Sequence, residues 1–227
     1  MRKISSRLYC FSPPAMIAIF VLEIVLAIYT IWRYRMKSIA RIVVTMLVLL
    51  ALFQLAEYHV CGANSNYSLG WSRLGFVAIT LLPALALHLI HKIAHKKVHY
   101  IVWFAYATSL IFAIIFGLSP SAFAHHVCTG NYAIFHLTGH LGAYYFVFYY
   151  LWLFVGIGLS LYYAIDSDKQ IRTALILQVC GYLSFLLPTA LVNTISPATI
   201  AGLPSIMCGF AVMYALILVF GIVPKSD

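Results

Sequence analysis

Two neighbouring segments decide the fold, FQLAEYHVCG (53–62) and WSRLGFVAITLLP (71–83), which a short polar loop joins. The first places the carboxylate of Glu57 near the end of an apolar run, and the second places Arg73 at the start of the next. A charged side chain deep in lipid costs several kcal/mol unless it is paired or hydrated, so an ionisable residue there indicates a functional site. The pair predicts two membrane spans with polar groups near their connection.

The rest of the chain has the composition of a membrane protein. Of its 227 residues, 64% are hydrophobic and 8% are charged, whereas a soluble domain carries about 25% charged residues. A transmembrane helix needs about 20 apolar residues, and the sequence has seven such segments, at about 15–33, 39–60, 71–91, 99–118, 139–165, 171–192 and 198–223. We predict an all-α, seven-transmembrane helix bundle in a lipid bilayer, with residues 1–227 forming a single domain.

The net charge of +9 is spread over short basic clusters between the apolar segments. Such clusters orient membrane loops, so we expect no nucleic-acid partner. With seven spans, ten Lys and Arg residues fall on one side and four on the other. The positive-inside rule then puts the N-terminus outside and the C-terminus inside.

The cysteines suggest a cross-link on the outer side. Cys61 ends the second span, and Cys128 lies in SAFAHHVCTGNYAIF (121–135), the longest irregular connection. Because both face a compartment that tolerates disulfides, we predict a Cys61–Cys128 bond. Two free thiols are the alternative, and Cys10 is the competing partner.

Polar residues gather in the outer half of the predicted bundle. Glu23 lies about eight residues into the first span, roughly 12 Å deep at the helical rise, and Gln54 shares a helix face with Glu57. We expect His136 and His140 to enter the fifth span four residues apart on one face. The predicted outward pocket, for a small ligand or an ion, is lined by Glu23, Gln54, Glu57, Arg73, His136, His140 and Asn193. The alternative is a structural Glu57–Arg73 pair, but Glu23 has no such partner in view.

The histidines of HLIHKIAHKKVH (88–99) are the weaker candidates for a metal site. His88, His91 and His95 align on one helix face, where neutral imidazoles can bind zinc or iron. A basic helix end that faces anionic lipid headgroups is the preferred interpretation. No cofactor is therefore predicted, and a histidine-bound metal or haem is the alternative.

Other features bear on the class of protein. GxSxG, HExxH and P-loop patterns are missing from the sequence, which favours a non-enzymatic function. Pro83 and Pro188 are expected to interrupt the third and sixth spans. The aromatic run YYFVFYYLW (144–152) is interpreted as packing, with the binding of an apolar ligand as the alternative. Intramembrane carboxylates also fit a small transporter, in which they would be coupling sites.

The segment FQLAEYHVCG…WSRLGFVAITLLPALALHLIHKI resembles the N-terminal seven-helix sensor region of bacterial histidine kinases and related signalling proteins. The residues that fit its pattern, over about forty positions, are Trp71, Arg73, Leu74, Phe76, Leu82 and Pro83. The resemblance implies a receptor-like or sensor-like module in a prokaryotic cytoplasmic membrane, which binds a small ligand or a protein partner. Only PKSD follows the seventh span, so we expect output through a membrane or cytoplasmic signalling partner. A membrane enzyme, an electron-transfer protein or a small transporter is the alternative.

Overall fold

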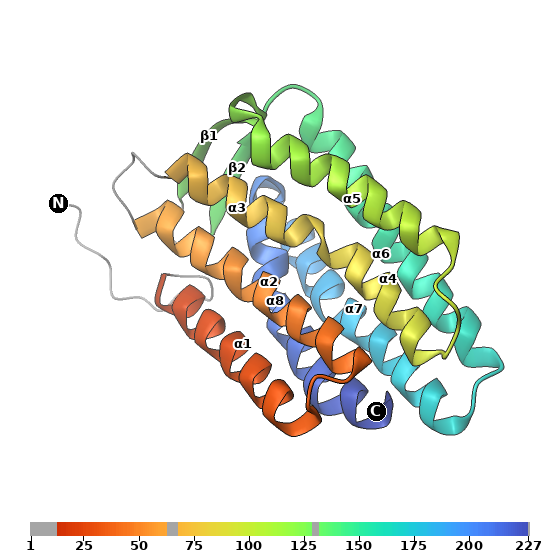
Figure 1. Cartoon of the computed structure of the whole chain (residues 1–227). Helices are drawn as coiled ribbons and strands as arrows, with labels where there is room; N and C mark the ends of the chain where they lie inside the picture. The colour runs from red at the N-terminus through yellow and green to blue at the C-terminus, as the bar shows by residue number, and fades with distance from the viewer. Residues whose placement is uncertain (1–12, 63–67, 129–131, 227) are drawn as a thin grey trace.

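In the part of the chain that the structure describes, seven helical segments are long and apolar enough to cross a membrane. Figure 1 shows the helices packed side by side as a bundle. The structure is a computed structural model that describes residues 13–62, 68–128 and 132–226. The main helices are α1 (Pro13–Tyr34), α2 (Ser38–Gly62), α3 (Ser68–Thr80), α4 (Leu82–Ile93), α5 (Tyr100–Leu118), α6 (Leu141–Ile165), α7 (Lys169–Ile195) and α8 (Leu203–Leu216). Every predicted span boundary lies within three residues of the observed one. The seven-helix membrane fold is confirmed.

Two of the seven spans are built from more than one helical piece. The third consists of α3 and α4, which meet at Leu81, where Pro83 supplies no backbone N–H and sits in the first turn of α4. The seventh begins with the 3₁₀ helix η2 (Pro197–Gly202), continues as α8 and the π-helical η3 (Ile217–Ile222), and ends with α9 (Val223–Ser226). Pro188, by contrast, lies inside α7, which continues to Ile195.

A β-hairpin covers the outer end of the bundle, where the sequence predicted an irregular connection. After the short 3₁₀ helix η1 (Pro120–Ala122), strand β1 (Phe123–Cys128) pairs antiparallel with β2 (Ala133–Leu137). The predicted disulfide is present: Cys61 of α2 is bonded to Cys128 of β1, and their Cα atoms are 5.5 Å apart. The hairpin is therefore covalently tied to the second span.

The spans differ in how deeply they are buried. The second, third and seventh spans are mostly enclosed by protein, whereas the first and fourth are mostly exposed along their length. In Figure 1, α1 and α5 accordingly lie at opposite sides of the bundle, with α2 and α4 between them. The exposed side chains of the outer helices are apolar, as lipid contact requires. Glu23, Gln54 and Glu57 are fully buried in this interior.

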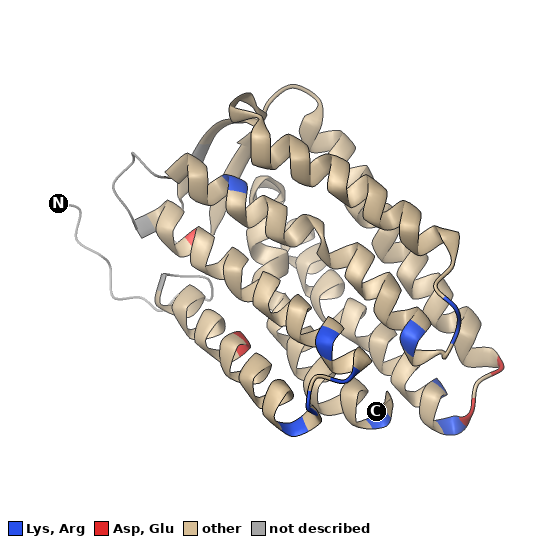
Figure 2. Ribbon diagram, in the orientation of Figure 1, with Lys and Arg blue, Asp and Glu red and all other residues tan. Residues whose placement is uncertain are grey.

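The charged residues divide the molecule into two ends. Figure 2 shows Lys and Arg gathered at the end opposite the hairpin, near the C-terminus. By the positive-inside rule that end faces the cytoplasm. The hairpin and its disulfide then lie on the outer side, where disulfides persist. The orientation stays a prediction that these two features support.

Candidate functional site

The outer half contains a cleft of about 240 Å³ with an aromatic lining, which α3, β2, α6, η2 and α8 form. We call it the outer cleft. Helix α6 supplies more of the lining residues than any other element, and its Tyr145 and Tyr149 lie four residues apart on the same helix face. Phe76 of α3 packs against the Tyr145 ring with centroids 5.7 Å apart, and Phe135 of β2 completes this side. The run YYFVFYYLW therefore builds a cavity wall as well as packing.

The outer cleft is open at its rim between α6 and η2. Phe146 of α6 and Ile200 of η2 line the cleft, yet both are about half exposed to the surroundings of the bundle. Phe146 also stacks on Tyr150, with ring centroids 4.4 Å apart. An apolar molecule can thus reach the cleft from the outer part of the bilayer.

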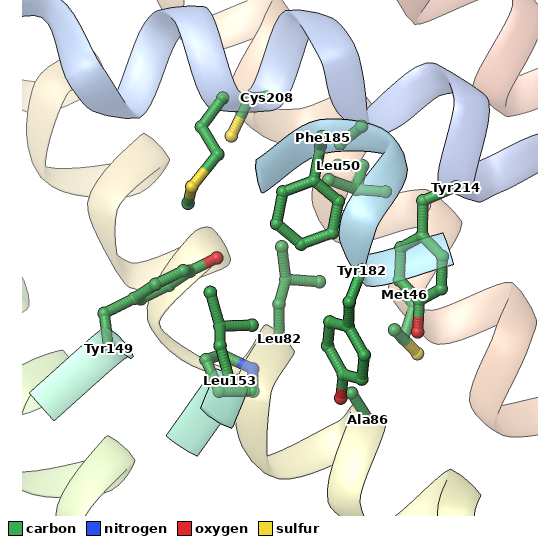
Figure 3. A pocket seen from close by; sticks show the side chains of 13 residues that line it. Met46, Leu50, Leu82, Ala86, Tyr149, Leu153, Tyr182, Phe185, Cys208 and Tyr214 are labelled. Atoms are coloured by element: carbon green, nitrogen blue, oxygen red, sulfur yellow. The ribbon is translucent and has the colours of Figure 1, made fainter. Parts of the chain in front are cut away.

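The inner end of the outer cleft adjoins a smaller, more enclosed cavity of about 30 Å³. Tyr149, Met207 and Cys208 line both hollows, so these three side chains form the partition between them. Figure 3 shows the Tyr149 hydroxyl directed into the inner cavity, which Tyr182 and Phe185 border from α7. A space of this size holds about one or two water molecules.

Behind the partition, Ser205 connects three elements. Its hydroxyl oxygen accepts a hydrogen bond from the backbone N–H of Ala133 at the start of β2, 3.2 Å away. The same hydroxyl is hydrogen-bonded to the carboxyl group of Glu57 on α2. Because the hydroxyl accepts from β2, its own proton is free to go to Glu57. This Ser205 bridge joins α2, α8 and the hairpin at a fully buried site.

Several buried polar atoms near this bridge have no hydrogen-bond partner among the described residues. Neither carboxyl oxygen of Glu23 has a hydrogen-bond partner among the described residues, and the same holds for Nε2 of Gln54 and Oε1 of Glu57. The carboxyl groups of Glu23 and Glu57 both act electrostatically on Cys208. The two acids, on α1 and α2, therefore lie within electrostatic range of the partition residue Cys208.

Arg73 does not pair with Glu57. Its Nε donates to the carbonyl oxygen of Phe116 at 3.2 Å, and a terminal nitrogen donates to that of Gly117. These carbonyls belong to the last turn of α5 and have no partner within their own helix. Arg73 thus caps α5 and ties it to α3, and no ion pair staples the second and third spans in the described part of the chain.

The remaining predicted pocket residues are dispersed. His136 lies on β2, where its ring stacks on that of His125 with centroids 4.1 Å apart, and it lines the outer cleft. His140 is exposed and precedes α6, so the expected helical face shared by the two histidines is wrong, because residues 133–137 form a strand. Asn193 accepts a hydrogen bond from the Thr199 hydroxyl at 2.7 Å and so fastens α7 to η2.

The three candidate metal ligands have separate neighbours. His88 is hydrogen-bonded to Tyr106 of α5, with Nδ1 and the hydroxyl oxygen 3.1 Å apart. His91 is fully buried, bonded through Nδ1 to the carbonyl of Leu87 and 3.3 Å from the Tyr163 hydroxyl through Nε2. His95 lies two residues beyond the end of α4 and has a positive φ of 51°. Across residues 13–62, 68–128 and 132–226, no group of three or more metal-binding side chains converges.

Sequence reasoning missed the two α8 residues that matter most here. Ser205 and Cys208 stand in an apolar stretch and carry no motif, and their roles depend on packing against α2 and α6. The aromatic run of α6 was a usable signal, because tyrosines four residues apart predict one helix face rich in hydroxyl groups. As for known proteins, no family model matches this chain, and no curated protein matches it either.

Proposed function

We propose that this seven-helix membrane protein is a receptor-like module that binds a small, mainly aromatic or apolar molecule in the outer cleft. The observation that carries the proposal is the cleft itself, a preformed hollow of about 240 Å³ with an aromatic lining. An apolar cavity of about 150 Å³ is already large enough for benzene. Hollows that are mostly apolar, with a few convergent polar groups, are where proteins bind small molecules.

The chemistry of the lining restricts the ligand. Among the described residues, the ionisable side chains that line the outer cleft are those of His136, three tyrosines and Cys208. A permanently charged ligand would lack a counter-charge there, so the ligand is uncharged. Its polar group, if it has one, would meet His136 at one end or Cys208 at the other. The tyrosine and phenylalanine faces favour an aromatic ring through offset stacking and edge contacts.

A response to the ligand would travel through α8. Met207 and Cys208 belong to the wall of the outer cleft, and Ser205 on the same helix is bonded to Glu57. A ligand that displaces the partition therefore acts on the helix that continues to the cytoplasmic end of the seventh span. This is the arrangement expected of a sensor, and it agrees with the resemblance to the kinase sensor region. That resemblance, the signalling partner and the prokaryotic membrane are part of the proposal.

The first prediction concerns binding in this cleft. The neutral fluorophore 1-aminonaphthalene is titrated onto the full-length protein in lipid nanodiscs, with empty nanodiscs as the background. We expect a saturable rise in its emission for the wild type. Gly142 lines the cleft, so the larger side chain of Gly142→Phe would occupy part of the space for the probe. This variant should weaken binding at least tenfold.

Gly158→Phe is the matched control for this titration. It places the same side chain on the same helix, but at an exposed position with no heavy atom within 4 Å of the added Cβ. The control should bind the probe as the wild type does. Equal binding by both variants, or emission that never saturates above the lipid background, would contradict the proposal.

A further inference from the structure

The basic end of the bundle, which we expect to face the cytoplasm, contains a third hollow with a different character. This basic cleft of about 400 Å³ lies between α2, α4 and α5. Its polar lining consists of Ser38, Arg41, Thr45, His88, Lys92 and Tyr106. None of the four acidic residues that the structure describes is among the lining residues. Two cationic side chains thus face a cleft to which the described part of the chain contributes no carboxylate.

The polar groups of the basic cleft are arranged in two levels. Arg41 is the fourth residue of α2, and Lys92 is the last but one of α4, so both lie near the membrane surface. Thr45 follows Arg41 by four residues, and His88 precedes Lys92 by four residues. Both therefore lie about one helical turn deeper in the membrane. The charged side chains therefore lie at the membrane surface, and the neutral polar side chains lie one level deeper.

The deeper level keeps a hydrogen-bond donor for a ligand. His88 and Tyr106 share one hydrogen bond between Nδ1 and the hydroxyl oxygen. If the tyrosine donates, the neutral imidazole carries its proton on Nε2; if Nδ1 donates, the tyrosine proton is left over. In both tautomers one donor is not used by the mutual bond. Both side chains are half-buried and line the cleft, so this donor is within reach of a bound molecule.

We propose that the basic cleft binds the headgroup of an anionic phospholipid from the inner leaflet, such as phosphatidylglycerol. A phospholipid presents its phosphate at the surface and its ester carbonyls just below, in the same order as the two levels of the cleft. Arg41 and Lys92 hold the phosphate, and the donor of the His88–Tyr106 pair meets an ester carbonyl. Basic pockets between transmembrane helices on the cytoplasmic side are suited to such headgroups.

The test counts bound lipid on the purified full-length protein by native mass spectrometry. The protein in detergent is titrated with dioleoyl phosphatidylglycerol or, separately, with dioleoyl phosphatidylcholine. We expect the wild type to retain one phosphatidylglycerol and to prefer it over phosphatidylcholine at least tenfold. Arg41→Gln/Lys92→Gln should lower that affinity by roughly thirtyfold, since each basic group near the lipid surface contributes about a factor of five.

Lys96→Gln/Lys97→Gln is the control, because it removes the same charge from the same end of the protein outside the cleft. It should keep the preference for phosphatidylglycerol. An equal loss in both double variants would mean a diffuse charge effect and would overturn the proposal. If the first double variant does not fold, Arg41→Gln alone, at an exposed side chain, serves in its place.

A competition experiment separates a lipid from a free anion. Excess glycerol 3-phosphate should fail to displace bound phosphatidylglycerol, because it lacks the ester carbonyls and the acyl chains. If glycerol 3-phosphate or inorganic phosphate displaces the lipid completely, the cleft is a site for soluble anions and the proposed occupant is wrong.

Discussion

Ser205 is the residue on which the organisation of the outer half depends. One hydroxyl group serves a backbone N–H of the hairpin and a buried carboxyl group of α2 at the same time. Glu57 already has one oxygen without a partner among the described residues. Without Ser205, both the N–H of Ala133 and the Glu57 carboxyl would be left without this partner in a buried site. A buried polar group that loses its partner is expensive, typically about 1–3 kcal/mol.

The second prediction follows from this bridge. Ser205→Ala should lower the midpoint of thermal unfolding, with a loss of stability of about 1–3 kcal/mol. Unfolding is followed in detergent through the intrinsic fluorescence of the four tryptophans. Glu57→Gln should be milder, because the amide oxygen still accepts the hydrogen bond from Ser205.

Ser160→Ala provides the comparison for the Ser205 variant. Ser160 is as fully buried as Ser205, but its hydroxyl has no hydrogen-bond partner in the described part of the chain. Its removal should leave the midpoint unchanged or raise it. If the two serine variants have the same midpoint of thermal unfolding, the Ser205 bridge does not stabilise the protein.

At the level of helices, small residues decide how closely the last spans approach one another. A methyl group added at Gly181 of α7 would overlap the ring of Tyr214 on α8. A methyl group at Gly156 of α6 would likewise meet the Tyr182 hydroxyl, 2.5 Å from the added Cβ. Membrane helices pack closely where small residues let a large neighbour in. Here one tyrosine packs directly against each glycine, and these two contacts set the distances between α6, α7 and α8.

The third prediction tests this spacing. Gly181→Ala should destabilise the protein by about 1–3 kcal/mol, because the added methyl group would overlap the buried Tyr214 ring. Gly158→Ala, at an exposed position on α6, should be neutral or slightly stabilising, since alanine favours a helix over glycine. The two thermal unfolding midpoints are compared in the same detergent. Equal midpoints would show that α7 and α8 are not held at this separation.

The hairpin is an element that could not be stable by itself. A two-stranded hairpin is marginal in water at best. Here it is fastened to the bundle at one strand by the Cys61–Cys128 bond and at the other by the Ala133–Ser205 hydrogen bond. Because β2 also lines the outer cleft, these two attachments keep one wall of the proposed ligand site in place.

For the whole molecule, the separation of charge predicts its orientation in the membrane. The end that carries most Lys and Arg residues should face the cytoplasm, and the hairpin should face outward.

The fourth prediction checks this orientation in intact cells. In a Cys10→Ser/Cys180→Ser background, single cysteines are introduced as Ser196→Cys near the hairpin end and Lys97→Cys at the basic end. Both positions are exposed. A membrane-impermeant maleimide should label the first in intact cells and the second only after the cells are opened. The reverse pattern would invert the topology and leave the basic end outside.

The fold followed from the sequence far better than the site did. Span positions depend on local hydropathy, so each boundary could be placed to within three residues. The disulfide followed from topology, because two cysteines on the same side of the membrane can meet. The partners of Arg73 and Ser205 depend on which helices become neighbours, and hydropathy contains no such information. The hairpin was missed because residues 123–137 carry little alternation of polar and apolar side chains.

The disulfide also constrains how the protein is made. Its two cysteines lie 67 positions apart in the sequence, and the whole third and fourth spans lie between them. During synthesis Cys61 emerges first, and it can meet Cys128 only after both spans have been threaded through the membrane. If either span is skipped, the two thiols end up in different compartments. The bond therefore forms only after both spans have been inserted, and a chain that skips one of them cannot form it.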